Sequence, residues 1–300
     1  MNVVVAGPGL MGAQIGAEYA LGRHRVVFLA RDAARARGRI AAAFQLARDL
    51  SVYPPPAIAA ASDRVSIVAG VDELEPDIDL VIESIAERLA EKVTMLRALA
   101  SLLPRAILAS NTSSLSITEI GEGAGAPGRM IGTHYWNPPL LMPLVEVIRT
   151  DRTDPAIVTV MTETLTDLGK RPILAERDVP GFIWNRMQLA LLREAVWLAE
   201  NGVASPEAID QVVREGLARR WRYTGPFQTA ALGGAATFER IAENLWPVLS
   251  NADQLAGLRR WLNEDPEVLG RTREQRDTGL RDDLRRDQAR AAPQGENDES

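Results

Sequence analysis

The chain has 300 residues, of which 46% are hydrophobic and 25% are charged. This length fits two domains, and the composition excludes global disorder and fibrous classes because it can fill a sizeable core. The sequence contains no cysteine, which excludes disulfides, thiolate nucleophiles and thiolate metal ligands. The 34 basic and 40 acidic residues leave a net charge of −6, and this balance argues against a nucleic-acid partner.

The sequence shows no feature of a membrane protein. Its apolar runs fall short of the roughly 18 residues that span a bilayer, so we expect no membrane partner. It enters an apolar run at Asn2 with no basic region or cleavage site before it, so we expect no signal peptide. Because a chain without cysteine suits a reducing compartment, we expect a cytoplasmic protein.

Short apolar runs alternate with helical segments through the first half of the chain. The expected strands are residues 2–6, 25–30, 65–68, 79–83 and 106–109, and the expected helices are residues 13–21, 32–50 and 87–102. This alternation, with nearly continuous apolar strands, predicts a doubly wound, mostly parallel sheet with helices on both faces. Three prolines at 54–56 leave room for only a short second helix before the strand at residue 65.

The pattern changes near residue 179. Residues 182–200 repeat apolar side chains at helical spacing, and Ser205 before Pro206 is a typical helix start. Helical segments continue to about residue 290. We therefore expect three parts, namely an α/β domain over residues 1–178, an all-helical substrate and dimerisation domain over residues 179–290, and a disordered tail over residues 291–300.

Residues 7–12 read G-P-G-L-M-G, a G-x-G-x-x-G turn between a strand and a helix. Glycines here let the backbone turn tightly and approach a pyrophosphate at the helix N-terminus. The alternative is a plain tight turn. We interpret the turn as a Rossmann-like dinucleotide site whose cofactor-binding residues are Gly7, Gly9, Leu10, Met11 and Gly12.

The end of the second strand indicates which dinucleotide binds. An acid that holds the ribose 2′-hydroxyl is usual there, about 20 residues after the glycines. In this sequence Ala30 stands at that position and Arg31 follows it. Alanine removes a carboxylate that would repel a 2′-phosphate, and the guanidinium can pair with that phosphate, which favours NADP over NAD. The alternative is that Arg31 is solvated and Asp32 reaches the ribose.

Two histidines occur in the chain, and we expect His24, in a turn, to be exposed. His134 follows a strand that begins at Met130, at the sheet edge where ligands bind. Glu146 is a lone acid in an apolar strand, and a buried acid needs a partner. The turn at 137–139 can bring the two together, so we predict a catalytic His134–Glu146 pair. Taken singly, His134 has the alternative of a hydrogen-bonded core histidine, and Glu146 has that of a structural ion pair.

In combination, these segments resemble the 3-hydroxyacyl-CoA dehydrogenase family over about residues 1–235. The matching features are the glycine turn, Glu87 with Lys92, S-N-T-S-S at 110–114, H-x-x-N-P at 134–138, P-L-V-E-V at 143–147 and P-G-F-I-x-N-R at 180–186. The remainder, from about residue 216, is more similar to the lambda-crystallin (L-gulonate 3-dehydrogenase) branch, and carnitine dehydrogenases are also similar.

The resemblance implies roles for individual residues. His134 would be the acid–base residue and Glu146 would orient it. Ser113 would bind the reacting oxygen, and Asn185, supplied by the helical domain, would bind that oxygen or the acyl carbonyl. The side chains implied to line the nicotinamide and ribose side are Glu87, Lys92, Asn111 and Asn137. The implied cofactor is NAD(P), without a metal. Ala30 and Arg31 depart from the family, which usually has an acid there.

The resemblance implies an oxidoreductase of fatty acid metabolism that interconverts a 3-hydroxyacyl thioester, bound to CoA or a carrier, and its 3-oxo form. One alternative is a dehydrogenase of a small free 3-hydroxy acid such as gulonate or carnitine. Another is a non-catalytic nucleotide-binding or structural protein. Candidate contacts for carrier phosphates are Arg35, Arg37, Arg39 and Arg48, which otherwise only solvate their helix. Because residues 182–200 are apolar on more than one face, we expect a homodimer through the helical domain.

Overall fold

The computed structural model describes residues 1–253, Leu258 and residues 272–291. Contacts divide the chain into two units, one formed by Met1–Asn185 with the chain from Asp277 onward and the other by Arg186–Arg276. The division follows Asn185, later than the boundary expected at residue 178, because the backbone at 183–184 is hydrogen-bonded to Glu146 of the sheet. The expected disordered tail lies outside the described residues beyond Ala291.

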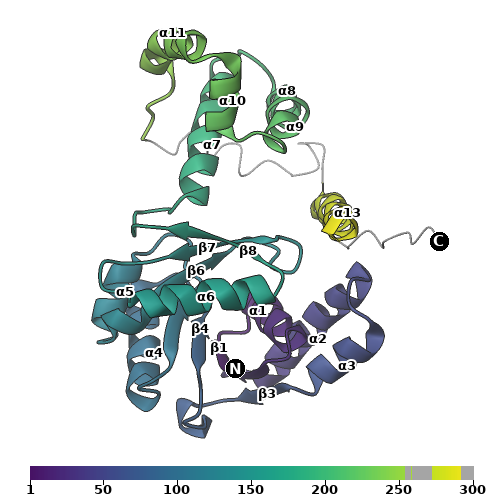
Figure 1. Ribbon diagram of the computed structural model, residues 1–300, viewed down its shortest axis with the longest axis vertical. Helices are drawn as coiled ribbons and strands as arrows, with labels where there is room; N and C mark the ends of the chain where they lie inside the picture. The colour runs from purple at the N-terminus through teal and green to yellow at the C-terminus, as the bar shows by residue number, and fades with distance from the viewer. Residues whose placement is uncertain (254–257, 259–271, 292–300) are drawn as a thin grey trace, which may run out of the picture. The chain divides into compact units, whose positions relative to one another are not determined.

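The first unit is built on an eight-stranded sheet in the order β3-β2-β1-β4-β5-β6-β7-β8 (Figure 1). The strands are β1 (Asn2–Ala6), β2 (Arg25–Leu29), β3 (Val65–Val68), β4 (Leu80–Glu83), β5 (Ile107–Ser110), β6 (Met130–Tyr135), β7 (Leu144–Ile148) and β8 (Arg171–Ala175). The first six pair in parallel, β7 runs antiparallel to β6, and β8 pairs in parallel with β7. The predicted doubly wound, mostly parallel sheet is confirmed.

Helices cover both faces of the sheet. They are α1 (Leu10–Leu21), α2 (Ala33–Leu50), α3 (Pro55–Ser62), α4 (Leu89–Leu102), α5 (Ile117–Gly123) and α6 (Pro155–Asp167). Because successive side chains of a strand point to opposite faces, Val3 and Val5 pack with α1, α2, α3 and α6, whereas Val4 and Ala6 pack with α4 and α5. This burial on two sides explains why the strands are nearly continuous apolar runs.

The short α3 matches the expectation from the three prolines, and α6 and β8 are elements that the sequence patterns did not single out. His24 contradicts the expectation of an exposed turn residue. It is half-buried, because its ring packs against Tyr19 and its Nδ1 lies 3.0 Å from the N-terminal amine. The last helix, α13 (Arg273–Ala291), belongs from Asp277 onward to the first unit rather than to the helical one.

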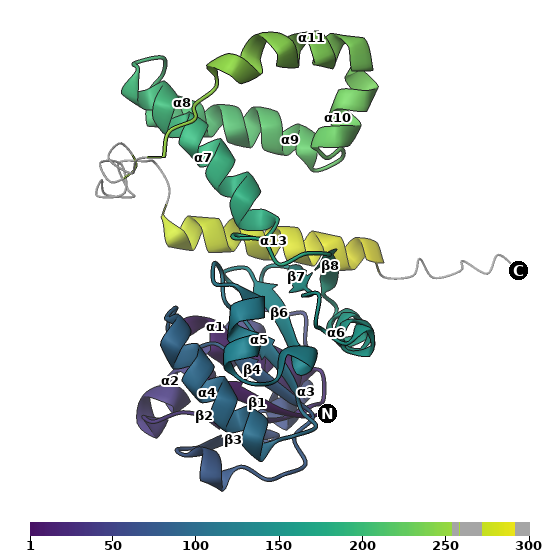
Figure 2. The same cartoon turned by 90° about the vertical axis from the view of Figure 1, so that its left-hand side faces the viewer.

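The helical unit follows directly from the first. It contains α7 (Trp184–Glu200) from Arg186 on, α8 (Pro206–Gln211), a π-helical turn (Val212–Leu217), α9 (Ala218–Trp221), α10 (Pro226–Gly233) and α11 (Ala235–Leu245). Figure 2 shows α10 and α11 meeting at an angle. Ser205 caps α8 as predicted, because its Oγ accepts the Ala208 N–H. In the described part of the chain, no helix has the length and apolar content needed to cross a membrane.

Candidate active site

The glycine turn lies between β1 and α1, and its geometry requires glycine at two positions. Gly7 has φ +89°, and a Cβ there would lie 2.8 Å from the Ser84 carbonyl oxygen. A Cβ at Gly12 would lie 2.3 Å from the Gly7 carbonyl oxygen, so the helix packs directly on the turn. Gly9 caps α1 without a side chain, which leaves the first-turn N–H groups of α1 open to an anion. These features fit the pyrophosphate of a dinucleotide.

A cavity of about 1060 Å³ opens at this turn, between the ends of β1, β2 and β4. Gly7, Gly9, Ala30 and Arg31 line it, together with residues of α2 and α4. The other predicted cofactor residues lie elsewhere. Leu10 and Met11 begin α1 outside this lining, and Gly12 packs beneath the turn. The cavity therefore matches the adenosine half of a dinucleotide site.

The cavity wall carries more basic than acidic side chains, with four arginines against Asp32 and Glu91. Arg31, Arg35 and Arg39 line it, and within the described residues none of the three forms an ion pair. Arg35 lies in the first turn of α2, at the positive end of the helix dipole. That end repels a cation and attracts an anion. Asp32 Oδ1 accepts the Arg35 backbone N–H at 2.9 Å, so Asp32 caps α2. The wall is therefore suited to an anion.

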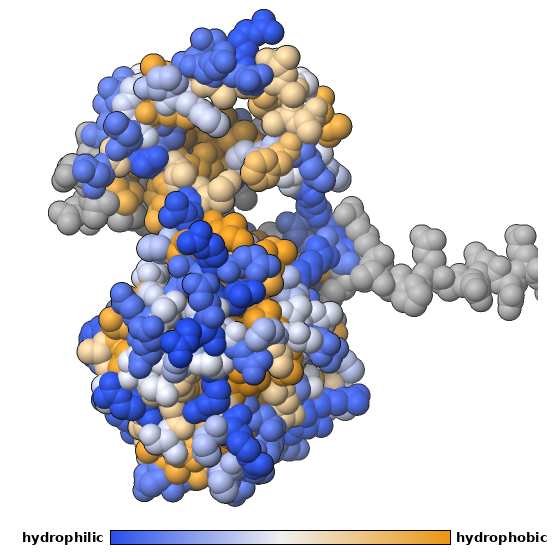
Figure 3. Space-filling model, turned by 60° about the vertical axis from the view of Figure 1, so that its left-hand side comes forward, coloured by the Kyte–Doolittle hydropathy of each residue, from blue (hydrophilic) through white to orange (hydrophobic). Residues whose placement is uncertain are grey.

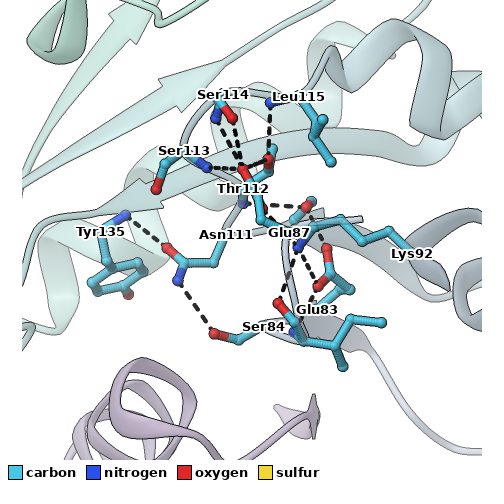
Figure 4. A network of polar contacts seen from close by, with 12 residues as sticks. Glu83, Ser84, Glu87, Lys92, Asn111, Thr112, Ser113, Ser114, Leu115 and Tyr135 are labelled. Carbon is cyan, nitrogen blue, oxygen red and sulfur yellow. Dashed lines mark hydrogen bonds and ion pairs between the residues drawn. The ribbon is translucent and has the colours of Figure 1, made fainter. Parts of the chain in front are cut away.

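Lys92, on α4, is buried between two carboxylates (Figure 4). Its Nζ lies 2.7 Å from Glu83 Oε1 and 3.3 Å from Glu87 Oε2. Glu83, at the end of β4, also accepts the Ser110 hydroxyl at 2.5 Å and the Ile85 N–H at 2.7 Å. Reasoning from the sequence missed Glu83, although it carries the same signal as Glu146, a lone acid in an apolar strand. The network joins the ends of β4 and β5.

Glu87 holds the turn that follows β5. Its Oε1 accepts the Thr112 hydroxyl at 2.6 Å, the Ser113 N–H at 2.9 Å and the Ser114 N–H at 3.1 Å (Figure 4). Burial by itself raises the pKa of Glu87, but the hydrogen bond from Thr112 and the charge of Lys92 together lower it. The carboxylate thus stays ionised and fixes the backbone that presents the exposed Ser113 side chain.

Three predicted asparagines occupy different places in the first unit. Asn111 joins two strand ends, because its Oδ1 accepts the Tyr135 N–H at 2.9 Å and its Nδ2 donates to Ser84 Oγ at 3.3 Å. Asn137 is exposed in the turn after β6, where its bond to Pro138 is cis. Asn185 Nδ2 donates to the Ser113 carbonyl oxygen at 2.8 Å. Asn185 was expected in the helical domain, but it belongs to the first unit because this bond and those at 183–184 tie it there.

His134 and Glu146 face each other across the antiparallel pair β6–β7. They are register partners, and His134 Nδ1 lies 2.7 Å from Glu146 Oε2. Both side chains are buried. The predicted contact between them is confirmed. Because a carboxylate only accepts hydrogen bonds, Nδ1 carries the proton and Nε2 keeps a free lone pair in the neutral imidazole.

Glu146 has further donors that the sequence did not reveal. Its Oε1 accepts the backbone N–H groups of Ile183 at 2.8 Å and Trp184 at 2.9 Å, and its Oε2 also accepts Trp136 Nε1 at 3.4 Å. The indoles of Trp136 and Trp184 stack with centroids 3.8 Å apart. Burial acts to raise the pKa of Glu146, but the hydrogen bonds from His134, Trp184 and Ile183 together lower it. The carboxylate is therefore ionised and can stabilise a protonated His134.

Among the described residues, no three histidine, aspartate or glutamate side chains are grouped so that they could hold a metal ion. What the site offers is a dinucleotide cradle, a histidine with a free ring nitrogen and an ordered serine turn, all at the carboxyl edge of one sheet. These are the parts that oxidation of an alcohol requires, namely a proton acceptor and a place for an electron acceptor.

Residues 2–179 match the family model described as 3-hydroxyacyl-CoA dehydrogenase, NAD binding domain. Residues 181–265 match its companion, the C-terminal domain of the same family. The chain belongs to the 3-hydroxyacyl-CoA dehydrogenase family. It is therefore a nicotinamide-dependent oxidoreductase of the kind that acts on CH–OH groups.

Two solved structures differ in how much of this chain they match. The structure of 5-formyl-3-hydroxy-2-methylpyridine 4-carboxylic acid 5-dehydrogenase, described as an NAD⁺-dependent dismutase, covers 97% of this chain and 95% of its own, with 30% identity and a TM-score of 0.79. The (S)-3-hydroxybutyryl-CoA dehydrogenase of Ralstonia eutropha covers 72% and 77%, with 30% identity and a TM-score of 0.68. Among curated relatives, L-carnitine dehydrogenase of Streptomyces griseus is 36% identical over 83% of this chain and 75% of its own length.

Proposed function

We propose that this dehydrogenase oxidises the hydroxyl group of a small free hydroxy acid, with His134 as the general base. The observation that carries the chemistry is the 2.7 Å contact between His134 Nδ1 and Glu146 Oε2 on facing strands. A histidine oriented in this way has Nε2 free to take a hydroxyl proton. The buried carboxylate then faces the imidazolium that forms, which lowers the energy of the charged state.

The other polar groups assist the same step. A nicotinamide cofactor, when bound, supplies the acceptor for the carbon-bound hydrogen and its electron pair. Ser113, presented by the turn that Glu87 holds, donates to the reacting oxygen in this proposal. Asn185 supports that turn through its bond to the Ser113 carbonyl oxygen. In the reverse direction, the protonated His134 returns its proton to the carbonyl oxygen as it is reduced.

Two observations favour a free acid over a thioester. The solved structure with 30% identity and a TM-score of 0.79 is named for a pyridine carboxylic acid, and a curated relative with 36% identity is named for carnitine. A 3-hydroxyacyl-CoA dehydrogenase of Archaeoglobus fulgidus also covers 96% of this chain, but with 25% identity and a lower TM-score of 0.65. The arginines that could bind carrier phosphates also do not gather in one place. Arg35 and Arg39 line the cofactor cavity, Arg37 lines a separate groove, and Arg48 donates to Gln45 on its own helix.

A 3-hydroxyacyl thioester of fatty acid metabolism is the second candidate substrate, and it was the first expectation from the sequence. The name of the family and the match to the CoA-dependent enzyme of Ralstonia eutropha support it. The dyad and the serine turn would serve either substrate, because both carry the same reacting hydroxyl.

A panel of free 3-hydroxybutyrate, gulonate, carnitine and 3-hydroxybutyryl-CoA, each tested with both nicotinamide cofactors, decides between these candidates. We expect a free acid to exceed the thioester by about a hundredfold in kcat/KM, or about 2.7 kcal/mol of transition-state binding. The opposite ratio would overturn the free-acid proposal. His134→Ala should lose about 10²- to 10⁴-fold in kcat with cofactor affinity unchanged. A His134→Ala enzyme with near-full activity would show that the dyad is not the base.

We further propose that NADP(H) is preferred over NAD(H). Ala30 stands where a ribose-binding acid would be, and Asp32 is used as the cap of α2. Arg31 and Arg35 line the same cavity without an ion pair among the described residues, so both can pair with a 2′-phosphate. The measurement is the ratio of kcat/KM values for the two cofactors.

A homodimer through the helical unit completes the proposal. None of the residues of α7, α10 and α11 is buried in the single chain. Apolar side chains lie together on the face of this unit that Figure 3 presents, and Phe227 and Trp246 are 91% and 75% exposed. Apolar exposure on this scale marks an interface, and identical chains commonly meet about a two-fold axis. Light scattering at micromolar concentration should give twice the chain mass, and a monomer would contradict the proposal.

A further inference from the structure

The chain has two lysines, and the site described above uses only Lys92. Lys170, directly before β8, is also buried. Its Nζ lies 2.5 Å from Glu18 Oε1 on α1 and donates to the carbonyl oxygens of Pro139 at 2.7 Å and Met142 at 3.0 Å. These three acceptors match the three N–H groups of an ammonium. Lys170 thus joins α1 to the segment that connects β6 with β7.

That connection, residues 138–142, forms a further backbone hydrogen bond to α1, besides the two that its carbonyl oxygens accept from Lys170. Gln14 Oε1 accepts the Leu140 N–H at 3.3 Å. Gln14 and Glu18 are one turn apart on α1, so they present their side chains on the same face of the helix. The side chains of Leu140 and Leu141 are buried in an apolar cluster with Leu50 of α2. Polar contacts from α1 and Lys170 therefore fix the backbone of the turn, while apolar packing fixes its side chains.

Stability alone does not explain a buried ion pair here. Removing two charges from water costs several kcal/mol per ion, and an apolar pair of similar volume is often as stable or more so. Burial also raises the pKa of Glu18 despite the nearby Lys170, which shows how poorly the site suits a charge. What the ion pair provides, and an apolar pair would not, is hydrogen bonds to two defined carbonyl oxygens of the turn.

The turn begins immediately after Asn137, which lies at the ligand-binding edge of the sheet. In a doubly wound sheet a dinucleotide spans the point where the strand order reverses, which here lies between β1 and β4. The large cavity takes up the ends of β1 and β2 and reaches the end of β4, so the other half of the cofactor falls toward the ends of β5 and β6. Asn137 lies two residues after the end of β6.

We infer that Lys170, anchored by Glu18, is a positioning residue that fixes the 138–142 turn so that Asn137 meets the nicotinamide half of the cofactor. The inference rests on the nicotinamide site of the proposed function but not on the identity of the substrate. Failure to find a substrate would therefore leave it testable by binding alone, and a His134→Ala enzyme that stays active would not affect it.

The test is the double variant Glu18→Leu with Lys170→Met, which replaces the ion pair by apolar side chains of similar size. Binding is measured by calorimetry for the preferred reduced cofactor and for the matching adenosine diphosphoribose, which lacks the nicotinamide. We expect the dissociation constant of the cofactor to rise about tenfold. Binding of the diphosphoribose should stay as in the wild type, because it needs only the glycine turn and the large cavity.

Glu18→Gln is the matched control. This variant should be less stable, because the buried ammonium loses its counter-charge. A glutamine oxygen still accepts from Lys170, so in the folded protein the bonds to Pro139 and Met142 persist and both ligands should bind within about twofold of wild type. If the double variant does not fold, Gln14→Leu removes only the bond to the Leu140 N–H and should weaken the cofactor selectively, by less. The inference is overturned if the folded variant binds the cofactor as well as wild type does, or if both ligands weaken equally.

Discussion

The carboxylate of Glu146 that contacts His134 also accepts the two backbone N–H groups that lead into α7. The antiparallel register of β6 and β7 places His134 and Glu146 opposite each other on adjacent strands, so the pairing of the strands itself brings the two side chains together. The orientation of the histidine and the start of α7 therefore depend on one carboxylate.

Glu146→Gln should slow the reaction. A neutral amide stabilises the imidazolium less than a carboxylate does, so kcat should fall, but by less than in His134→Ala. The variant should also melt at a lower temperature, because the N–H groups of Ile183 and Trp184 then face a weaker acceptor. Glu122→Gln, at an exposed site, is the control. A kcat equal to that of the wild type would show that Glu146 does not assist His134.

Gly12→Ala and Gly38→Ala should have opposite effects. A Cβ at Gly12 meets the Gly7 carbonyl oxygen at 2.3 Å, so the glycine turn must shift, and both stability and cofactor affinity should fall. A Cβ at Gly38, inside α2, meets nothing within 4 Å, and alanine there should stabilise the protein by about 0.5–1 kcal/mol. Chemical denaturation and cofactor titration measure both quantities. Equal cofactor affinity in the two variants would exclude a pyrophosphate at this turn.

Replacing Ala30 by Asp together with Arg31 by Gln should move the cofactor preference toward NAD(H). The new carboxylate can bind the ribose 2′-hydroxyl and repels a 2′-phosphate, and the loss of the guanidinium removes a partner for that phosphate. The readout is the ratio of kcat/KM values for the two cofactors in the variant and in the wild type. If the wild type already prefers NADH by about tenfold or more, Arg31 is a bystander.

The free energy of unfolding should fall in acid. The pKa values of Glu87 and Glu146 lie below the ordinary 4.5 in the folded protein. The unfolded chain therefore binds more protons as the pH drops below about 4.5, and the stability that these groups provide above that pH is lost. Glu18 acts in the opposite sense, because its raised pKa costs stability as the pH rises above 4.5. Denaturation curves from pH 3 to 7 should be flatter at the acid end for Glu87→Gln, and an unchanged acid slope would contradict this assignment.

Much of the fold is readable in the local sequence. The valines of β1 form a continuous apolar run because both faces of a central parallel strand are buried. The turn at Gly7 is recognisable because few other residues tolerate its φ of +89°. α6 and β8 were not recognised, because Thr-rich and partly exposed segments such as Arg171–Ala175 carry a weak periodic signal.

The candidate site was likewise predictable from the sequence in part. His134 and Glu146 were paired from the sequence because a lone acid in an apolar strand needs a partner and a short turn separates the two. The sequence by itself thus determined the glycine turn, the sheet and the dyad, since each follows from a local pattern or from neighbouring strands. Only the tertiary structure decided the pairing of Lys170 with Glu18, the stacking of Trp136 on Trp184 and the return of α13 to the first unit. These contacts join segments far apart in the chain, and packing of the whole sheet and its helices, rather than local periodicity, brings such segments together.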